Sequence, residues 1–339
     1  MSFILTSIAA ITALYGLKKG GDAYSDTKEA HAIGSQAQDL FKNAEADLRL
    51  AREETRATME KLGERKLVVW DEQIGRFVSL FERLRDVELE GQPLVDGLDV
   101  APPSQEELAE MKEVSIKAGE IVTGGMQALG AGALVGLASY GGAMTFATAS
   151  TGTAIAGLSG AAAKSATLAW FGGGSLASGG FGMAGGMAVL GGLVAGPVLA
   201  VGGIVMSAKA KENLAEARKN LAKARRAAAQ MTTATSLVRG IERVVKNFDR
   251  TVEDLASRMD TVLDRLEEVI AKAGTDYRAF DDRQARTVHT AVEFAHMMKL
   301  LLETPLLTED GALDKNSSKV LASGRRLLEQ SGEALSAAA

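Results

Sequence analysis

Two long stretches without charge constrain the fold of this chain more than any other feature. Residues 121–163 and 165–208 hold no Asp, Glu, Lys or Arg, and Lys164 alone separates them. These arms have 43 and 44 residues, and residues 119–203, which overlap them, carry 24 of the chain's 37 glycines. An apolar helix of this kind is buried either in the core of a helical bundle or in a membrane.

The composition excludes several classes of function. A net charge of −5 argues against a generally basic surface for nucleic acid, so we expect no nucleic-acid partner. The chain has no Cys, which removes disulfides, thiolate metal sites and Cys nucleophiles. Only three His and 5% aromatic residues remain to build an enzyme pocket. We therefore expect neither an enzyme nor a bound cofactor.

The first 17 residues are apolar and end at Lys18 and Lys19. A secretory signal has its positive charge before the apolar run, so this order does not fit one. The run is also close to the shortest length that can cross a bilayer. Three interpretations remain open, namely an anchor in the membrane interface, a marginal span and a helix docked on the protein core.

Charged helices with a heptad spacing of small and apolar residues flank the apolar block on both sides. In the first flank this seam consists of Ala37, Phe41, Ala44, Leu48, Ala51 and Thr55, and after an interruption at Gly63 it continues with Leu67, Trp70, Ile74, Phe77, Phe81 and Leu84. In the second flank it consists of Leu214, Ala217, Leu221, Ala224, Ala228, Met231, Thr235 and Val238, then Val245, Phe248, Val252, Leu255, Met259, Val262, Leu266 and Val269. About eight heptads predict a long coiled coil.

The two flanks predict an elongated antiparallel pair of helices, since both are expected to leave the apolar block in the same direction. The Pro102-Pro103-Ser104 sequence starts a further helix, because Ser104 and Glu107 have the spacing of a capping box. A C-terminal helix is expected from Asp276 to Glu303, stopped by Pro305, and a last one from Asn316 to Leu335. No stretch has the alternation of a strand, so the predicted fold class is all-α.

Within the block we expect helices at residues 119–147, 155–170 and 183–207. The first and last are long enough to cross about 30 Å of hydrocarbon, so they predict a transmembrane helical hairpin. Glycines four residues apart form a smooth helix face on which two backbones approach closely. The candidate helix-packing residues are Gly132, Gly136, Gly182, Gly186, Gly192, Gly196 and Ala200.

Residues 209–226, directly after the block, hold seven Lys or Arg against two Glu. Such an excess is typical of the cytoplasmic end of a membrane span and of a segment that contacts anionic lipid. A solvated face of the coiled coil is the alternative interpretation. The candidate lipid-headgroup residues are Lys164, Lys209, Lys211, Arg218 and Lys219.

Three states of the apolar block remain open from the sequence. It is inserted in a membrane at all times, it is hidden in a bundle and inserted on a trigger, or it is the core of a bundle that never meets a membrane. Gly and Ala contribute little to insertion, and Gly disfavours a helix by about 1 kcal/mol relative to Ala. This marginal hydrophobicity is the reason to consider a triggered insertion.

Three apparent motifs lack the context that their chemistry needs. The GxGxxG spacing at residues 180–185 has no preceding strand and no acidic residue at the expected distance. The Lys164-Ser165 pair lacks the glycine that a phosphate-binding loop has before its lysine. His289, Glu293 and His296 share one helix face but have no evident fourth ligand. We therefore assign no catalytic, cofactor or metal site.

The run ATLAWFGGGSLASGGFGMAGGMAVLGGLVAGP, residues 166–197, resembles the core of a family of uncharacterised bacterial proteins. In that family a Gly-rich apolar block likewise lies between coiled-coil flanks, and the segments 13–30 and 63–91, with KLVVWDEQIGRF, are similar too. The resemblance implies no functional residues. In architecture the chain is also similar to α-helical pore-forming toxins and apolipoprotein-L-like proteins, which bury an apolar hairpin among amphipathic helices before inserting it.

These observations predict five regions: an N-terminal apolar segment (1–24), a first coiled-coil flank (25–100), the apolar hairpin (101–208), a second flank (209–274) and C-terminal helices (275–339). The function we expect is that of a bacterial membrane-active protein that inserts its Gly-rich hairpin, as a homo-oligomer, to perturb or permeabilise a membrane. The alternative is a coiled-coil scaffold, membrane-anchored or soluble, that recruits a partner protein for membrane remodelling or defence and forms no pore. The expected location is the cytoplasmic side of the bacterial inner membrane, or the cytosol with switchable membrane association.

Overall fold

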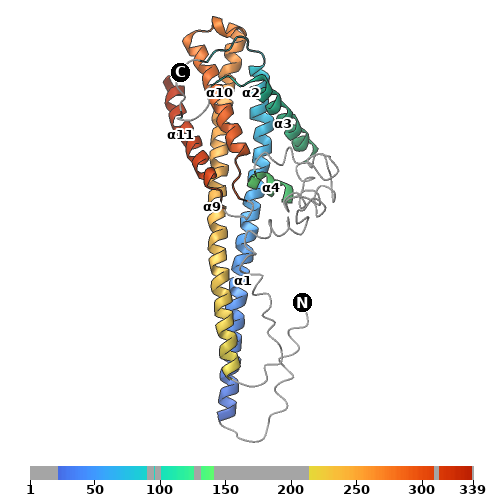
Figure 1. Ribbon diagram of the computed structural model, residues 1–339, viewed down its shortest axis with the longest axis vertical. Coiled ribbons are helices and arrows are strands. Elements are labelled where there is room, and N and C mark those ends of the chain that lie inside the picture. Colours follow the sequence, from blue (N-terminus) through green and yellow to red (C-terminus); the bar gives the residue numbers. More distant parts are fainter. Residues whose placement is uncertain are drawn as a thin grey trace. The chain divides into compact units, whose positions relative to one another are not determined.

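The computed structural model describes residues 22–89, 95, 101–125, 131–140, 214–308 and 313–337. In these residues the chain is helical and has no strand, only two isolated bridges, so the all-α class is confirmed (Figure 1). The elements are α1 (Asp22–Val69), the π-helical turn η1 (Trp70–Ile74), α2 (Gly75–Phe81), α3 (Gln105–Gly124), α4 (Ala131–Tyr140), α9 (Leu214–Ala273), the 3₁₀ turn η5 (Tyr277–Ala279), α10 (Asp282–Glu303) and α11 (Lys315–Ala337).

The chain divides into two compact units, and helices α1 and α9 each contribute to both. Unit 1 comprises Met1–Thr55 and Val194–Gly240, and its described part is a pair of helices. Its core is thin and rich in alanine, as the predicted seam requires. The seam residues that are buried there are Ala37, Ala44, Leu48, Ala51, Thr55, Leu221, Ala224, Met231, Thr235 and Val238.

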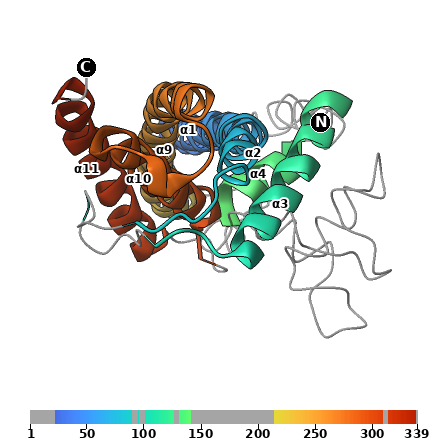
Figure 2. The ribbon, with the colours of Figure 1, turned by 90° about the horizontal axis from the view of Figure 1, so that it is seen from above.

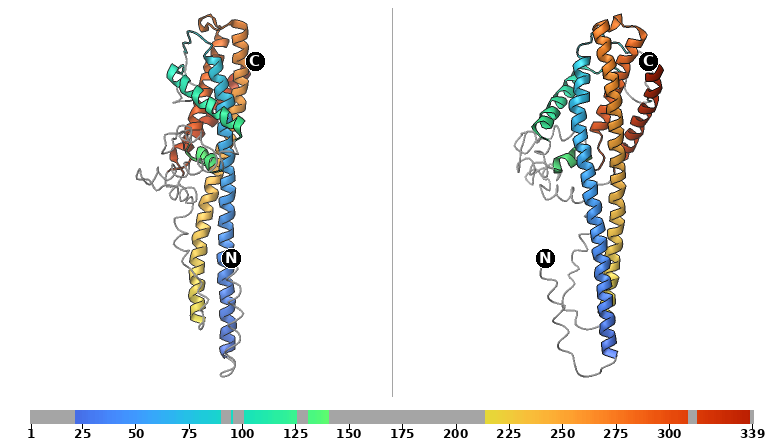
Figure 3. Two further views of the ribbon diagram at one scale, coloured as in Figure 1. Left: turned by 90° about the vertical axis from the view of Figure 1, so that its right-hand side faces the viewer. Right: turned by 180° about the vertical axis from the view of Figure 1, so that it is seen from behind.

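Unit 2 comprises Arg56–Leu193 and Ile241–Ala339 and has the larger core. The second parts of α1 and α9 lie side by side in it, with α3 on one side of this pair and α11 on the other (Figures 1, 2 and 3). The bulkier seam predicted for this region is confirmed, since Trp70, Phe77, Phe248 and Leu255 are at most 2% exposed.

Helices α1 and α9 run parallel in each unit. In unit 1 Arg218 pairs with Glu29 at 3.1 Å, and the Thr55 hydroxyl donates to the Val238 carbonyl at 3.4 Å. In unit 2 the residue numbers of the paired side chains again increase together along α1 and α9. The pairs there are Lys61 and Arg65 with Asp249, Arg65 with Glu253, Gln73 with Asp260, and Arg76 with Asp264 and Glu267.

The predicted antiparallel pair is therefore wrong, and helix α3 gives the reason. The first flank does not lead directly into the apolar block, because α3 runs back along η1 and α2. Lys112 of α3 pairs with Glu82 at 2.8 Å, whereas Gly119, seven residues later, lies against Asp71. This extra reversal lets the chain enter α9 in the same direction as α1.

The predicted helix boundaries largely agree with the structure. Ser104 and Glu107 form the expected capping box at the start of α3, with bonds of 3.2 and 2.8 Å. Helix α10 ends at Glu303, before Pro305 as expected, but it begins at Asp282 and not at Asp276, because Asp281 and Gln284 form a second capping box. Helix α11 extends the predicted last helix slightly at both ends.

Glycine 240, inside α9, offers a test of helix propensity without a packing change. A Cβ atom added there meets no atom within 4 Å. Gly240→Ala is therefore expected to raise the free energy of unfolding by about 0.5–1 kcal/mol, because alanine loses less backbone entropy in a helix. Urea denaturation measures the change, and a lower stability would show that this position needs glycine.

Candidate functional site at helix α4

Helix α4 is the first described part of the apolar block beyond α3, and it lies in the core of unit 2. Leu134, Val135 and Leu137 are each 5% exposed, and Ala138 is fully buried. The helix predicted over 119–147 is interrupted, because α3 ends at Gly124 and Gly125 has a φ of +93°, a conformation that favours glycine. The apolar segment after this break is thus packed against charged flanking helices.

Glycine 63 of α1 allows α4 to approach the backbone of α1. A Cβ atom at position 63 would lie 2.2 Å from the carbonyl oxygen of Leu134 and 3.0 Å from its Cα atom. No side chain fits at such a distance, so only glycine permits this contact. In the heptad pattern Gly63 is an interruption of the seam, and in the structure it is the point where α4 docks.

The C-terminal end of α4 is tied to the connection between α10 and α11. The backbone N–H groups of Leu306 and Leu307 both donate to the Ser139 carbonyl, at 2.7 and 3.1 Å. The Ser139 hydroxyl donates to the Val135 carbonyl at 2.7 Å and lies 3.9 Å from the sulfur of Met59. Two main-chain bonds therefore satisfy the Ser139 carbonyl, which is one of the acceptors that the end of a helix leaves without an intrahelical partner.

A buried lysine holds the same connection from the side of α1. The side chain of Lys66 is fully buried, and its Nζ atom donates to the Leu302 carbonyl at 3.0 Å and to the Thr304 carbonyl at 3.5 Å. The amine also lies 5.5 Å from the centre of the Phe248 ring. These carbonyls close the C-terminal end of α10, whose dipole offsets part of the cost of burying a cation there.

Burial lowers the pKa of Lys66 to about 7, and the carboxylate of Glu303 opposes that shift only in part. Burial also raises the pKa of Glu303, which Lys299 counteracts. Burial tends to lower the pKa of Lys299, but the carboxylates of Glu303 and Glu110 outweigh it and leave that pKa raised. Lys299 lies 3.2 Å from Glu303 and 3.5 Å from Glu110 of α3, so α3, α10 and α1 share one group of charges.

The structure describes four of the predicted site residues. Gly132 and Gly136 lie on α4, where Gly136 is buried. Arg218 and Lys219 are exposed on α9, and they lie 3.1 Å from Glu29 and 3.9 Å from Glu216. The remaining candidates lie outside the described residues, namely Lys164, Gly182, Gly186, Gly192, Gly196, Ala200, Lys209 and Lys211.

Among the helices that the structure describes, none combines the length and the hydropathy required to cross a bilayer.

Outside α4, the predicted His289–Glu293–His296 face contains a His–Glu contact. The Glu293 carboxylate is buried and lies 3.7 Å from His289 Nε2. Both residues belong to α10, so this contact lies within one helix.

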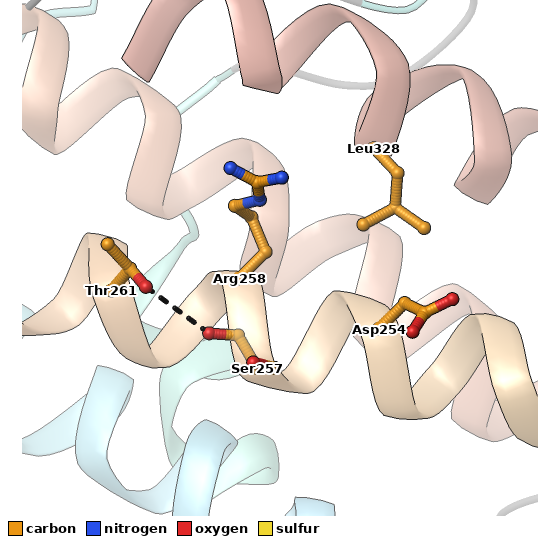
Figure 4. A pocket seen from close by; sticks show the side chains of 5 residues that line it. All are labelled: Asp254, Ser257, Arg258, Thr261 and Leu328. Atoms are coloured by element: carbon orange, nitrogen blue, oxygen red, sulfur yellow. Dashed lines mark hydrogen bonds between the residues drawn. The ribbon is translucent and has the colours of Figure 1, made fainter. Parts of the chain in front are cut away.

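A shallow hollow of about 420 Å³ between α9 and α11 was not anticipated from the sequence. Asp254, Ser257, Arg258, Thr261 and Leu328 line it. The Thr261 hydroxyl donates to the Ser257 carbonyl at 3.4 Å, and the Asp254 carboxylate lies apart from both hydroxyls (Figure 4). The lining residues therefore do not form an arrangement in which a base activates a nucleophile, and we place the candidate site at α4.

Comparison with protein-family models, curated proteins and solved structures finds no match to this chain. The resemblance drawn from residues 166–197 thus stays a prediction.

Proposed function

We propose that this chain is a membrane-active helical protein that keeps the start of its apolar block docked in a helical bundle and inserts the Gly-rich segment after release. The docking of α4 is the observation that supports the proposal. An apolar helix is stored there among charged helices, through a glycine contact at position 63 and two bonds to Ser139. Once inserted, Gly faces such as that of Gly192 and Gly196 would pack several copies into an oligomer that permeabilises the membrane.

Of the three states that the sequence leaves open, we propose triggered insertion, because the marginal hydrophobicity of the Gly-rich block suits both a buried and an inserted state. Residues 134–139 of the block are buried in unit 2, which argues against a block that is wholly inserted at all times. The uncharged segment 165–208 lies beyond α4 in the chain, so release of α4 would free the start of the block.

A covalent bridge between α1 and α4 tests this proposal. The side chains of Met59 and Ser139 are in contact at 3.9 Å, and the chain has no cysteine of its own. Because Met59 and Ser139 are at most 1% exposed, Met59→Cys with Ser139→Cys is joined in mild urea by a short thiol-bridging reagent that reductant cleaves and is then returned to buffer. The bridged protein is expected to release no dye from anionic vesicles, because α4 can no longer leave. Reductant is expected to restore the release.

The two single-cysteine variants, treated with the same reagent, serve as matched controls and are expected to release dye like the unmodified protein. Equal dye release from the bridged and the reduced protein would show that α4 need not leave the bundle. If neither form releases dye or floats with vesicles, the membrane proposal is wrong.

The second candidate is a scaffold that recruits a protein partner without forming a pore. The helix pair of unit 1 favours it, since Leu40, Leu50 and Leu237 are 36%, 49% and 64% exposed there. Such exposed leucines on a thin two-helix pair offer apolar area that a bound protein would cover. A protein that floats with vesicles but releases no dye would favour the membrane-anchored form of this scaffold.

A further inference from the structure

The connection that holds α4 is itself held by a titratable group. We define the strap as residues 302–307, which lie between the body of α10 and the start of α11. Lys66 donates to the carbonyls of Leu302 and Thr304 in this strap, and the strap donates through Leu306 and Leu307 to Ser139 of α4. The buried amine and the docked helix are therefore linked through six residues of chain.

We propose that the strap is a pH-sensitive latch, in which protonation of the buried Lys66 amine loosens residues 302–307 and releases α4. The inference rests on the proposed function, because the release of α4 is the step that would free the apolar block. Its physical basis is geometric, since the amine is fully buried and two carbonyls, one of them at 3.5 Å, and one aromatic face replace only part of the hydration that an ammonium loses. Movement of the strap would admit water to the amine.

The direction of the pH effect follows from the pKa of Lys66 in the two forms. The docked form has a pKa of about 7, and the released form, with a hydrated amine, has the ordinary value near 10.5. Between these values the released form binds one more proton, so the docked form loses stability as the pH falls through this range. From pH 8 to pH 6 the ratio of docked to released protein is expected to fall about tenfold, and below pH 6 it levels off.

Three charged groups on the neighbouring helices modulate this effect. Glu303 and Lys299 belong to α10 and Glu110 to α3, while α9 presents the uncharged ring of Phe248. Glu303 partly balances the ammonium. Burial raises the pKa of Glu303, so the docked form binds a proton at this carboxylate more readily than the released form does. As the pH falls, protonation of Glu303 therefore stabilises the docked form and opposes the effect of Lys66. Glu303→Gln removes the opposing group and is expected to lower the pKa of Lys66 further.

Hydrogen exchange of the full-length protein without lipid tests the latch. Protection factors, which are corrected for the intrinsic pH dependence of exchange, are measured at pH 6, 7 and 8. The amides of residues 134–140 are expected to lose protection about tenfold from pH 8 to pH 6. The amides of residues 221–238 in unit 1 are expected to keep theirs and serve as the internal control.

Lys66→Met, which keeps an apolar chain of similar length without the amine, is expected to make protection of α4 independent of pH in this range. Lys61→Met is the matched control, since that lysine side chain is 63% exposed, and it is expected to retain the tenfold change. Constant protection of α4 in the unmodified protein overturns the latch even if Lys66→Met fails to fold. Loss of protection in both units at once overturns it too, because that is global unfolding.

No membrane is present in this experiment, so its outcome is separate from that of the dye-release assay. A tenfold change in protection together with absent dye release would leave the latch standing and reject the membrane function. Dye release without the change in protection would support the membrane function and reject the latch.

Discussion

Gly63→Ala is expected to destabilise the protein by about 2–3 kcal/mol, although alanine is the better helix former. The added Cβ would lie 2.2 Å from the Leu134 carbonyl oxygen, which belongs to a backbone and cannot rotate away. Helix α4 must therefore move, at the cost of overpacking and of buried apolar contacts. Urea denaturation measures the loss, and hydrogen exchange of residues 134–140 shows whether it is concentrated in α4.

Gly240→Ala is the matched control, since it makes the same chemical change in the other long helix at a site with open space. The two substitutions are expected to change stability in opposite directions. An increase in stability for Gly63→Ala would mean that α4 does not dock against α1 at this point, and the candidate site would be lost.

Asp249→Ala is expected to cost about 2–3 kcal/mol. The Asp249 side chain is 8% exposed and accepts from Arg65, whose own side chain is 20% exposed, and from Lys61 at 3.2 Å. Removal of the carboxylate leaves a half-buried guanidinium with only Glu253 as a partner, and breaking a buried ion pair is far more costly than breaking an exposed one. Thermal or urea denaturation measures this loss.

A charge exchange at the same pair tests the parallel direction of α1 and α9. Arg65→Asp and Asp249→Arg are each expected to be destabilising, and the double variant is expected to recover at least about 1 kcal/mol of the summed loss. Arg76→Asp with Asp249→Arg, which joins positions that are not paired in the structure, is the control and is expected to show no recovery. Purely additive losses at 65 and 249 would contradict the parallel register.

The sequence predicted the helices and their buried faces well, because heptad spacing and capping boxes are local signals. The seam residues of both flanks are largely buried, and the Ser104–Glu107 box forms as expected. The direction of the helix pair could not be predicted in this way. Heptad spacing is the same for parallel and antiparallel helices, so the direction depends on how many reversals the intervening chain makes. Helix α3 adds one reversal that the prediction did not count.

The site at α4 was predicted only in part, because its main features look ordinary in the sequence. The apolar character of residues 131–140 was evident in the sequence. No local pattern indicated that their backbone would pack against Gly63, which precedes Leu134 by 71 residues. Lys66 did carry a signal that was missed. It follows Thr55, Met59 and Leu62 at the steps of four and three residues that define the seam, and all of these are buried. A charged residue at such a position indicates either a break in the seam or a buried charge.

Two contacts between α4 and the rest of unit 2 involve its main chain. Gly63 meets the backbone of Leu134, and Leu306 and Leu307 bind the carbonyl of Ser139. Neither contact requires a particular side chain at 134 or 139. An apolar helix of another sequence would satisfy both contacts equally well, provided that its length and direction were kept. The main chain of the helix therefore determines where it is stored, whereas its buried side chains, Leu134, Val135, Leu137 and Ala138, determine how tightly it is held there.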